Sequence, residues 1–141
     1  MTQLSTHFSL AELTVTSTGL PNSPNAQQLS RLTATAQAME AVRKLLGHPI
    51  RVNSGFRSAE VNRKVGGSPT SAHALGYAID FVCPAFGDAM AICKAIDASG
   101  IKFDQLIMEK NRWVHISFDP RMRQQVLSWW GGAYQPGLLD K

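Results

Sequence analysis

Two histidines and one aspartate are spaced along this chain in a way that suits a metal ion. His73 and Asp80 lie in the segment Ser71-Ala-His-Ala-Leu-Gly-Tyr-Ala-Ile-Asp80, and His115 follows in Trp113-Val-His-Ile-Ser117. Two imidazoles and one carboxylate form a mixed nitrogen and oxygen set that matches zinc with one coordination position left open for water. Zinc lowers the pKa of a bound water toward neutrality, so we expect a hydrolase that binds one zinc ion.

Four short motifs occur in the chain in a recognisable order. The segment Val52–Ser58 contains Ser-Gly-Phe-Arg-Ser, Val61–Ser71 follows it, and then come Ser-x-His-x-x-Gly-x-Ala-x-Asp and Trp-Val-His. Together they resemble the zinc D-alanyl-D-alanine carboxypeptidase family, which includes D,D-carboxypeptidases, D,D-dipeptidases and phage peptidoglycan endopeptidases. The segment Val61–Ser71 is similar to its carboxypeptidase-like members. The N-terminal segment Phe8–Leu13 is similar to the corresponding segment of phage-encoded relatives.

The resemblance implies a zinc metallopeptidase that hydrolyses a peptide bond of the bacterial peptidoglycan stem. Its metal ligands would be His73, Asp80 and His115. By the same resemblance, Arg57 contacts the substrate and stabilises the developing oxyanion, and Ser71 binds substrate. A guanidinium suits this task because its fork donates two hydrogen bonds. Both a D-Ala-D-Ala carboxypeptidase and an endolysin-type endopeptidase remain open.

Each of these residues also has a plainer interpretation. His73 alone would be a hydrogen-bonded loop histidine, Asp80 an exposed strand charge, Arg57 a surface side chain and Ser71 a loop cap. Their joint occurrence favours the metal site. An alternative function is a non-catalytic, zinc-containing module that binds the cell wall or serves as a virion structural part. A third is an unrelated soluble α+β domain.

Periodicity and turn residues predict the elements that position the site. Helical spacing predicts a helix from about Ala26 to Leu46, ending at Gly47, and alternation predicts a strand within 76–82. The implied fold is a single α+β domain over residues 1–141, with helices packed on a small antiparallel sheet. The resemblance implies the same fold, shared with the hedgehog signalling domain. Further predicted elements are a strand from Ile50 to Ser54, a helical turn over Ala59–Val65, a helix over Gly87–Ser99 that stops at Gly100, a hairpin over 105–118 and a last helix over Pro120–Leu127. No periodicity is found from Trp129 to Lys141.

The hairpin supplies a candidate catalytic base independently of any resemblance. If residues 110–112 form its loop, Glu109 pairs with Trp113 and Ile107 pairs with His115. This register gathers an apolar set on one face, whereas a two-residue loop would mix the two faces. It places Glu109 diagonally across from His115, within reach of a water at the metal.

The catalytic base cannot be transferred from the family by position. Several relatives carry a glutamate three residues before the last histidine, where this chain has Arg112. Others carry a histidine two residues before it, where this chain has Trp113. Glu109 is therefore the first candidate on geometry and Asp104 the second. The plainer interpretation of Glu109 is a solvated strand residue.

Composition limits the partners. The 141 residues are 44% hydrophobic, enough for one core, and no apolar run approaches the 18 residues of a membrane span. The net charge of +4 comes from scattered residues, so we expect no nucleic acid as partner. The partner that the resemblance implies is the peptidoglycan stem peptide. Cys83 and Cys93 are expected to be reduced and buried, with a bridge between them as the alternative. His7 and His48 match no motif, and we interpret both as structural or exposed.

The first eight residues lack a basic region followed by an apolar stretch, so no signal peptide is expected. A wall-cutting enzyme of this kind would be made in the cytoplasm. The resemblance implies two routes to the wall, holin-dependent phage lysis or carriage as a component of a phage particle. The sequence leaves the oligomeric state open.

Overall fold

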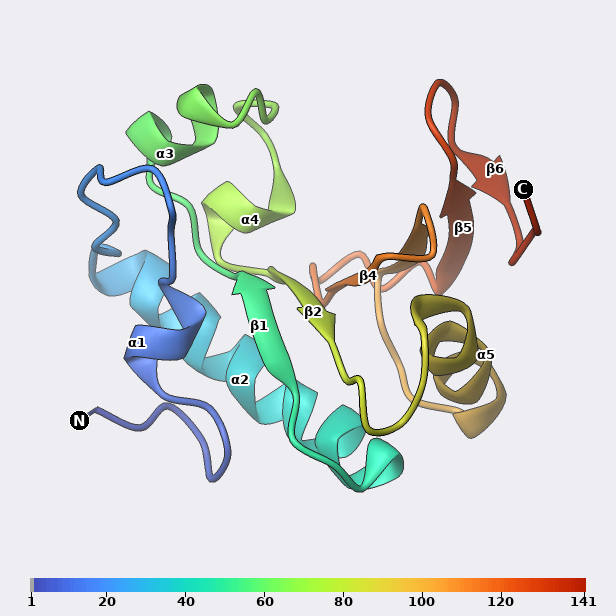
Figure 1. Ribbon diagram of the computed structural model, residues 1–141. Helices are drawn as coiled ribbons and strands as arrows, with labels where there is room; N and C mark the ends of the chain where they lie inside the picture. The colour runs from blue at the N-terminus through green and yellow to red at the C-terminus, as the bar shows by residue number, and fades with distance from the viewer. Residues whose placement is uncertain (1) are drawn as a thin grey trace.

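A six-stranded sheet organises the chain in the computed structural model, which describes residues 2–141 (Figure 1). Its strand order is β1-β2-β4-β3-β5-β6, and all neighbours are antiparallel except β3 and β5. The predicted α+β class is confirmed. The strands are β1 (Arg51–Ser54), β2 (Ala78–Val82), β3 (Gln105–Glu109), β4 (Trp113–Ser117), β5 (Gln125–Trp129) and β6 (Gln135–Pro136). The helices are α1 (Leu10–Leu13), α2 (Ala26–Leu46), α3 (Ala59–Lys64), α4 (Ala72–Leu75) and α5 (Ala89–Ser99).

Helices α2 and α5 pack against one face of the sheet, and the core lies between them. On β2, Ile79 and Phe81 are fully buried in this core. Because successive strand side chains point to opposite faces, Ala78 and Asp80 must face the other way. The remaining core residues of these elements are Leu32, Ala36, Met39 and Val42 of α2, Ile92, Cys93 and Ile96 of α5, and Leu106, Met108, Val114 and Ile116 of the hairpin. The site therefore lies on the face that these two helices leave open.

The two long helices begin and end at the residues that local chemistry dictates. Asn25 caps α2 by accepting from the backbone N–H of Gln28 at 2.8 Å, and the Gln28 side chain accepts from the Asn25 N–H at 2.9 Å. Gly47 ends α2 in the left-handed conformation, as predicted. Helix α5 starts two residues later than expected, after its N-cap Asp88, and stops at Gly100.

The predicted hairpin register is confirmed. Glu109 pairs with Trp113 and Ile107 pairs with His115 across β3 and β4. The loop residues Lys110 and Asn111 both have positive φ angles, 54° and 53°. The register places the apolar residues of both strands in the core, which is why a slip by one residue would be unfavourable.

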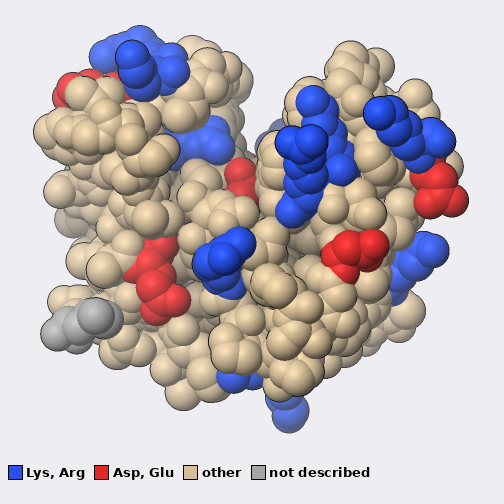
Figure 2. All heavy atoms as spheres, in the orientation of Figure 1, with Lys and Arg blue, Asp and Glu red and all other residues tan. Residues whose placement is uncertain are grey.

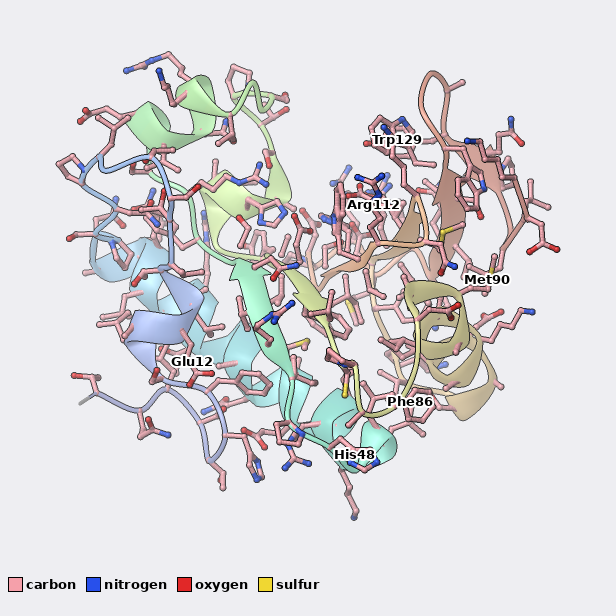
Figure 3. All side chains as sticks on the ribbon, in the orientation of Figure 1. Glu12, His48, Phe86, Met90, Arg112 and Trp129 are labelled. Carbon is pink, nitrogen blue, oxygen red and sulfur yellow. The ribbon has the colours of Figure 1, made fainter. Side chains whose placement is uncertain are left out.

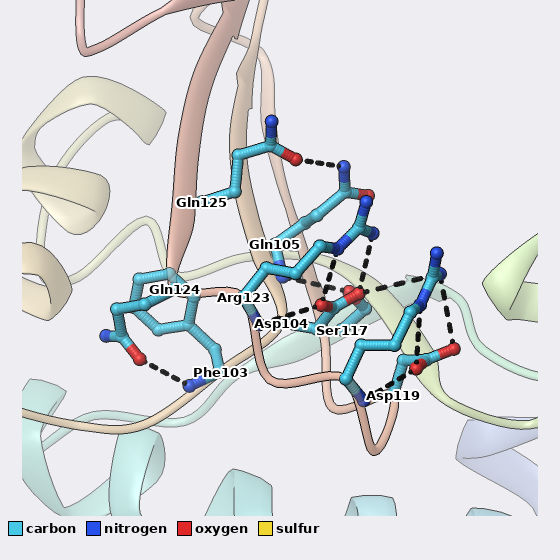
Figure 4. Close-up of polar contacts among 9 residues, drawn as sticks. Phe103, Asp104, Gln105, Ser117, Asp119, Arg123, Gln124 and Gln125 are labelled. Atoms are coloured by element: carbon cyan, nitrogen blue, oxygen red, sulfur yellow. Dashed lines mark hydrogen bonds and ion pairs between the residues drawn. The ribbon is translucent and has the colours of Figure 1, made fainter.

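The C-terminal segment corrects the sequence analysis, because the helix predicted over Pro120–Leu127 is wrong. Met122 and Gln124 have φ angles of 41° and 54°, which no right-handed helix accommodates. The buried carboxylate of Asp104 instead accepts from the backbone N–H of Arg123 at 3.0 Å and from its Nε at 2.8 Å (Figure 4). This anchoring lets β5 join β3 in parallel, and β6 follows in the tail where no regular element was predicted.

Four residues outside the site behave as expected. Cys83 and Cys93 are free and buried, and burial raises the pKa of Cys93 to about 12. His48 is exposed, and His7 holds the N-terminal segment to α2 through its Nδ1, 2.6 Å from Glu40 Oε1. Among residues 2–141, no helix is both long enough and apolar enough to cross a membrane.

The first prediction concerns Gly76, which joins α4 to β2 and so sets how His73 meets Asp80. Its φ is 90°, and a Cβ there would lie 3.0 Å from the carbonyl oxygen of Gln28. Gly76→Ala should lower the free energy of unfolding by about 2–4 kcal/mol, because left-handed strain and overpacking add. Gly100→Ala is the matched control, with φ 82° and no atom within 4 Å, and should lose only about 1–2 kcal/mol. Equal losses in urea unfolding would contradict this account.

Candidate active site

The three predicted ligands come from three elements and meet on the open face of the sheet. His73 lies on the one-turn helix α4 rather than in a loop, Asp80 on β2 and His115 on β4. Asp80 is paired directly with His115 in the antiparallel register of β2 and β4. One ligand atom from each of the three residues lies within 4.8 Å of the other two. The sequence-predicted cluster is therefore present in the fold.

The hydrogen bonds around His73 determine which of its ring nitrogens can bind a metal. Its Nδ1 lies 2.8 Å from the carbonyl oxygen of Gly55. A carbonyl only accepts, so Nδ1 carries the hydrogen and Nε2 presents its lone pair toward Asp80 Oδ1, 3.1 Å away. His115 Nδ1 approaches the same oxygen at 2.9 Å. A neutral His73 therefore presents a lone pair to the Asp80 carboxylate, and a cation between them would remove that repulsion, which fits a bound metal ion.

The charges of the cluster also suit a divalent cation. Burial lowers the pKa of His73 by more than the neighbouring Asp80 raises it. Burial by itself would raise the pKa of Asp80, but the two histidines hold it well below its usual range. Burial likewise lowers the pKa of His115, yet the hydrogen bond and charge of Asp80 prevail and raise it. Near neutral pH the centre thus holds an ionised carboxylate and a neutral His73, the forms that bind metal.

The cluster lies in a cleft of about 900 Å³. One wall is formed by Arg57 and the loop and helix over residues 65–73, and the other by β3 and the chain between 121 and 134. Figure 2 shows a notch between two lobes, with one acidic patch inside it and basic side chains on both sides. The three ligands therefore line an open cleft rather than an enclosed cavity.

Glu109 lines the same cleft as the three ligands. Burial raises the pKa of its carboxyl, and the negative charge of Asp80 raises it further. A carboxyl with a raised pKa is suited to proton transfer near neutral pH. Beside it, the buried Trp113 Nε1 makes no hydrogen bond of good geometry among residues 2–141, but it lies close enough to Glu109 to oppose part of this rise in pKa.

Asp104 is less suited to act as the base. Its carboxylate is held by Arg123, with Nε at 2.8 Å from Oδ1 and Nη2 at 2.9 Å from Oδ2 (Figure 4). The hydrogen bonds from Arg123 lower the pKa of Asp104, although burial opposes them. The ion pair makes Asp104 a structural anchor of this corner, and it leaves Glu109 as the better-placed carboxylate.

Arg57 and Ser71 both line the cleft. Arg57 Nη2 lies 3.5 Å from Asp80 Oδ2, and its Nε donates to Ser54 Oγ at 3.1 Å. Ser71 accepts from the backbone N–H of His73 at 3.2 Å and so caps α4, which matches its plainer interpretation. The same position leaves Ser71 beside the ligands, where its role in substrate binding stays a prediction.

Several residues that line the cleft were missed in the sequence. Gln125, Leu127, Trp129 and Tyr134 line its second wall, and Figure 3 places Trp129 on the lobe that carries β5. They were missed because the segment was assigned to a helix and an irregular tail. The alternation in Gln-Val-Leu-Ser-Trp, with a β-branched and an aromatic residue, was the available signal for a strand.

Comparison with known proteins places the site in a family. A family model described as Peptidase M15 matches residues 6–117, which include the three ligands, Arg57 and Glu109. No curated protein matches the chain. Strands β5 and β6 lie beyond the matched segment.

The second prediction concerns the metal itself. Protein purified without chelator should contain about one equivalent of zinc by elemental analysis, because the site offers three convergent ligands. His115→Ala should lose most of it, since two ligands hold zinc weakly. His48→Ala changes an exposed histidine and is the matched control, expected to keep the wild-type content. Full zinc content in His115→Ala would place the metal elsewhere.

Proposed function

Because this chain belongs to the peptidase M15 family, whose members are zinc peptidases, we propose that it hydrolyses a peptide bond in the stem of bacterial peptidoglycan. The observation that carries the proposal is the convergence of His73, Asp80 and His115 in one cleft with Glu109 and Arg57. A ligand set, a carboxylate with a raised pKa and a guanidinium are the parts that peptide hydrolysis requires.

Each side chain has a separate task in this proposal. His73, Asp80 and His115 would hold the zinc ion, which when bound supplies a Lewis acid that polarises the scissile carbonyl and lowers the pKa of water. Glu109 accepts the proton of the attacking water and passes it to the leaving amine. Arg57 donates hydrogen bonds to the developing oxyanion.

The bond that is cut is the main point to decide. The likeness of the segment Val61–Ser71 to carboxypeptidase-like members supports a D-Ala-D-Ala carboxypeptidase. The N-terminal segment Phe8–Leu13 instead supports a phage endopeptidase that cuts within the stem. Digestion of purified sacculi followed by mass spectrometry separates the two. Released D-alanine identifies the first, and freed stem peptides identify the second. Intact sacculi after incubation with zinc-loaded protein would overturn the proposal.

A non-catalytic wall-binding or virion module is the second candidate. It is favoured by the missing glutamate three residues before His115, where the chain has Arg112. The position of Glu109 in the cleft favours the enzyme instead. Zinc-loaded protein that sediments with sacculi without cutting them would support the module. We also propose a phage origin for the chain, with access to the cell wall by lysis or on a phage particle. This part of the proposal rests on the N-terminal segment Phe8–Leu13.

The third prediction tests Glu109. Glu109→Gln should keep its zinc and lose roughly 10²–10⁴-fold in kcat, the usual contribution of general acid–base catalysis. Glu60→Gln is the matched control because Glu60 is exposed on α3 and does not line the cleft. It should retain the wild-type rate. A Glu109→Gln variant with full activity would mean that another group, with Asp104 the next candidate, takes the proton.

The fourth prediction is the pH dependence. Glu109 must be ionised to accept a proton, and burial together with Asp80 raises its pKa. The protonated, inactive form therefore persists to higher pH than for an ordinary glutamate. The acid limb of kcat/KM should lie above the usual glutamate pKa of about 4.3. Bound zinc is measured in the same samples, and loss of zinc in step with activity would show that ligand protonation, rather than Glu109, controls the limb.

A further inference from the structure

The open face of the sheet continues past the metal ligands onto a strand that lies outside the family match. The match ends at Ser117, and β5 follows it, paired in parallel with β3. Side chains directly opposite one another in such a pair lie on the same face of the sheet. Three residues of β5 thereby join cleft residues of β3, in the pairs Gln105–Gln125, Ile107–Leu127 and Glu109–Trp129.

The middle pair forms an apolar floor. Asp80, His115, Ile107 and Leu127 are successive partners across β2, β4, β3 and β5, so they form one row. Ile107 and Leu127 are 5% and 9% exposed and line the cleft. Adjacent strands lie about 4.8 Å apart, so the floor extends roughly 10 Å beyond His115. An extended peptide advances about 3.3 Å per residue, so this length accepts about three residues.

Amide groups border the floor on one side. Gln105 Nε2 donates to Gln125 Oε1 at 2.7 Å. Among residues 2–141, neither carboxamide makes another hydrogen bond. The Gln105 oxygen and the Gln125 amino group therefore remain available. An acceptor and a donor side by side match the alternating C=O and N–H groups of a peptide backbone.

Two stacked aromatic rings border the floor on the other side. The rings of Trp129 and Tyr134 lie 6.0 Å apart at 27°. Trp129 Nε1 donates to the carbonyl of Gly132 at 3.1 Å, and Lys110 Nζ lies 5.1 Å from its ring centroid, so the indole is held in place. Tyr134 is 53% exposed and lines the cleft, so its ring is open to a ligand.

The charged groups beside the two glutamines are already paired. Arg123 binds Asp104, and Arg121 Nε lies 3.0 Å from Asp119 Oδ1 (Figure 4). Two guanidinium groups and two carboxylates leave no net charge there. The glutamine side of the floor therefore suits an uncharged ligand, whereas Glu109 and Lys110 carry charge at the aromatic side.

From this arrangement we infer that β5 and the tail up to Tyr134 form a subsite for about three residues of an extended peptide. The inference rests on the proposed peptidase function and names the substrate length that the site selects. The peptide lies along Ile107 and Leu127, its backbone bonds to the two glutamines, and Tyr134 covers it. Because a dipeptide at the metal cannot reach β5, the enzyme should favour longer stem peptides.

The test measures kcat/KM on three synthetic peptides that share the bond found in sacculus digests. One carries a single residue on each side of the bond, and each of the other two is extended by three residues on one side. Tyr134→Ala and Gln125→Ala should lower the long-to-short ratio of kcat/KM by about tenfold and threefold, the size of one lost aromatic contact and one hydrogen bond. The matched controls are Phe86→Ala, an exposed aromatic at the opposite end of the molecule from Trp129 (Figure 3), and Gln135→Ala, exposed on β6, and both should keep the wild-type ratio.

Binding separates this inference from the proposed reaction. Titration calorimetry of the long peptide with zinc-loaded Glu109→Gln should show about tenfold weaker binding when Tyr134→Ala is added. If no peptide is hydrolysed but this loss is found, the reaction is wrong and the subsite stands. If hydrolysis proceeds but both ratio and binding match the controls, the subsite is overturned and the peptidase stands. A loss of binding that is seen only when the peptide carries its disaccharide would mean that β5 and Tyr134 bind sugar, and it would contradict a peptide subsite.

Discussion

The close approach of three potential metal ligands is the feature on which this site depends. Asp80 Oδ1 lies 3.1 Å from His73 Nε2 and 2.9 Å from His115 Nδ1, close enough for one cation to bind all three side chains. The fold must hold these side chains together when no cation is bound. The paired strands β2 and β4 hold Asp80 against His115, and the carbonyl of Gly55 orients the ring of His73. The metal centre is thus supported by rigid elements rather than by mobile loops.

The same sheet that presents the ligands also builds the rest of the cleft. Its inner face is held by α2 and α5, so every second side chain of β2, β3 and β4 must face outward. Glu109 faces the cleft because the apolar residues beside it are buried, and Asp104 anchors the chain that leads into β5. One strand register therefore places both the metal ligands and the substrate contacts on the open face. A slip by one residue would turn these side chains into the core.

The parts of the fold with strong local signals could be predicted from the sequence. Helix α2 begins at a capping box and ends at Gly47, and the pairing of Glu109 with Trp113 follows from which faces can be buried. The ligand set was predicted for a different reason, because two imidazoles and one carboxylate suit zinc and their motifs together resemble a zinc peptidase family. Zinc itself is expected from the same donor types and from the family.

The C-terminal wall could not be predicted, because long-range contacts determine it. Residues 120–127 have the composition of a short helix, yet the backbone turns at Met122 and Gln124 to satisfy the buried carboxylate of Asp104. That carboxylate lies far away in the sequence, so no local pattern reports it. The orienting contact between His73 and the Gly55 carbonyl was missed for the same reason, since a backbone acceptor leaves no trace in residue types.

The most direct test of the account is to observe which nitrogen of each histidine binds the metal. Long-range ¹⁵N–¹H NMR correlation of histidine-labelled protein, recorded before and after zinc is added, distinguishes the ring nitrogens. The structure predicts that His73 keeps a protonated Nδ1 and coordinates through Nε2, while His115 coordinates through Nδ1. Coordination of His73 through Nδ1, or unchanged shifts at both histidines after zinc is added, would contradict it.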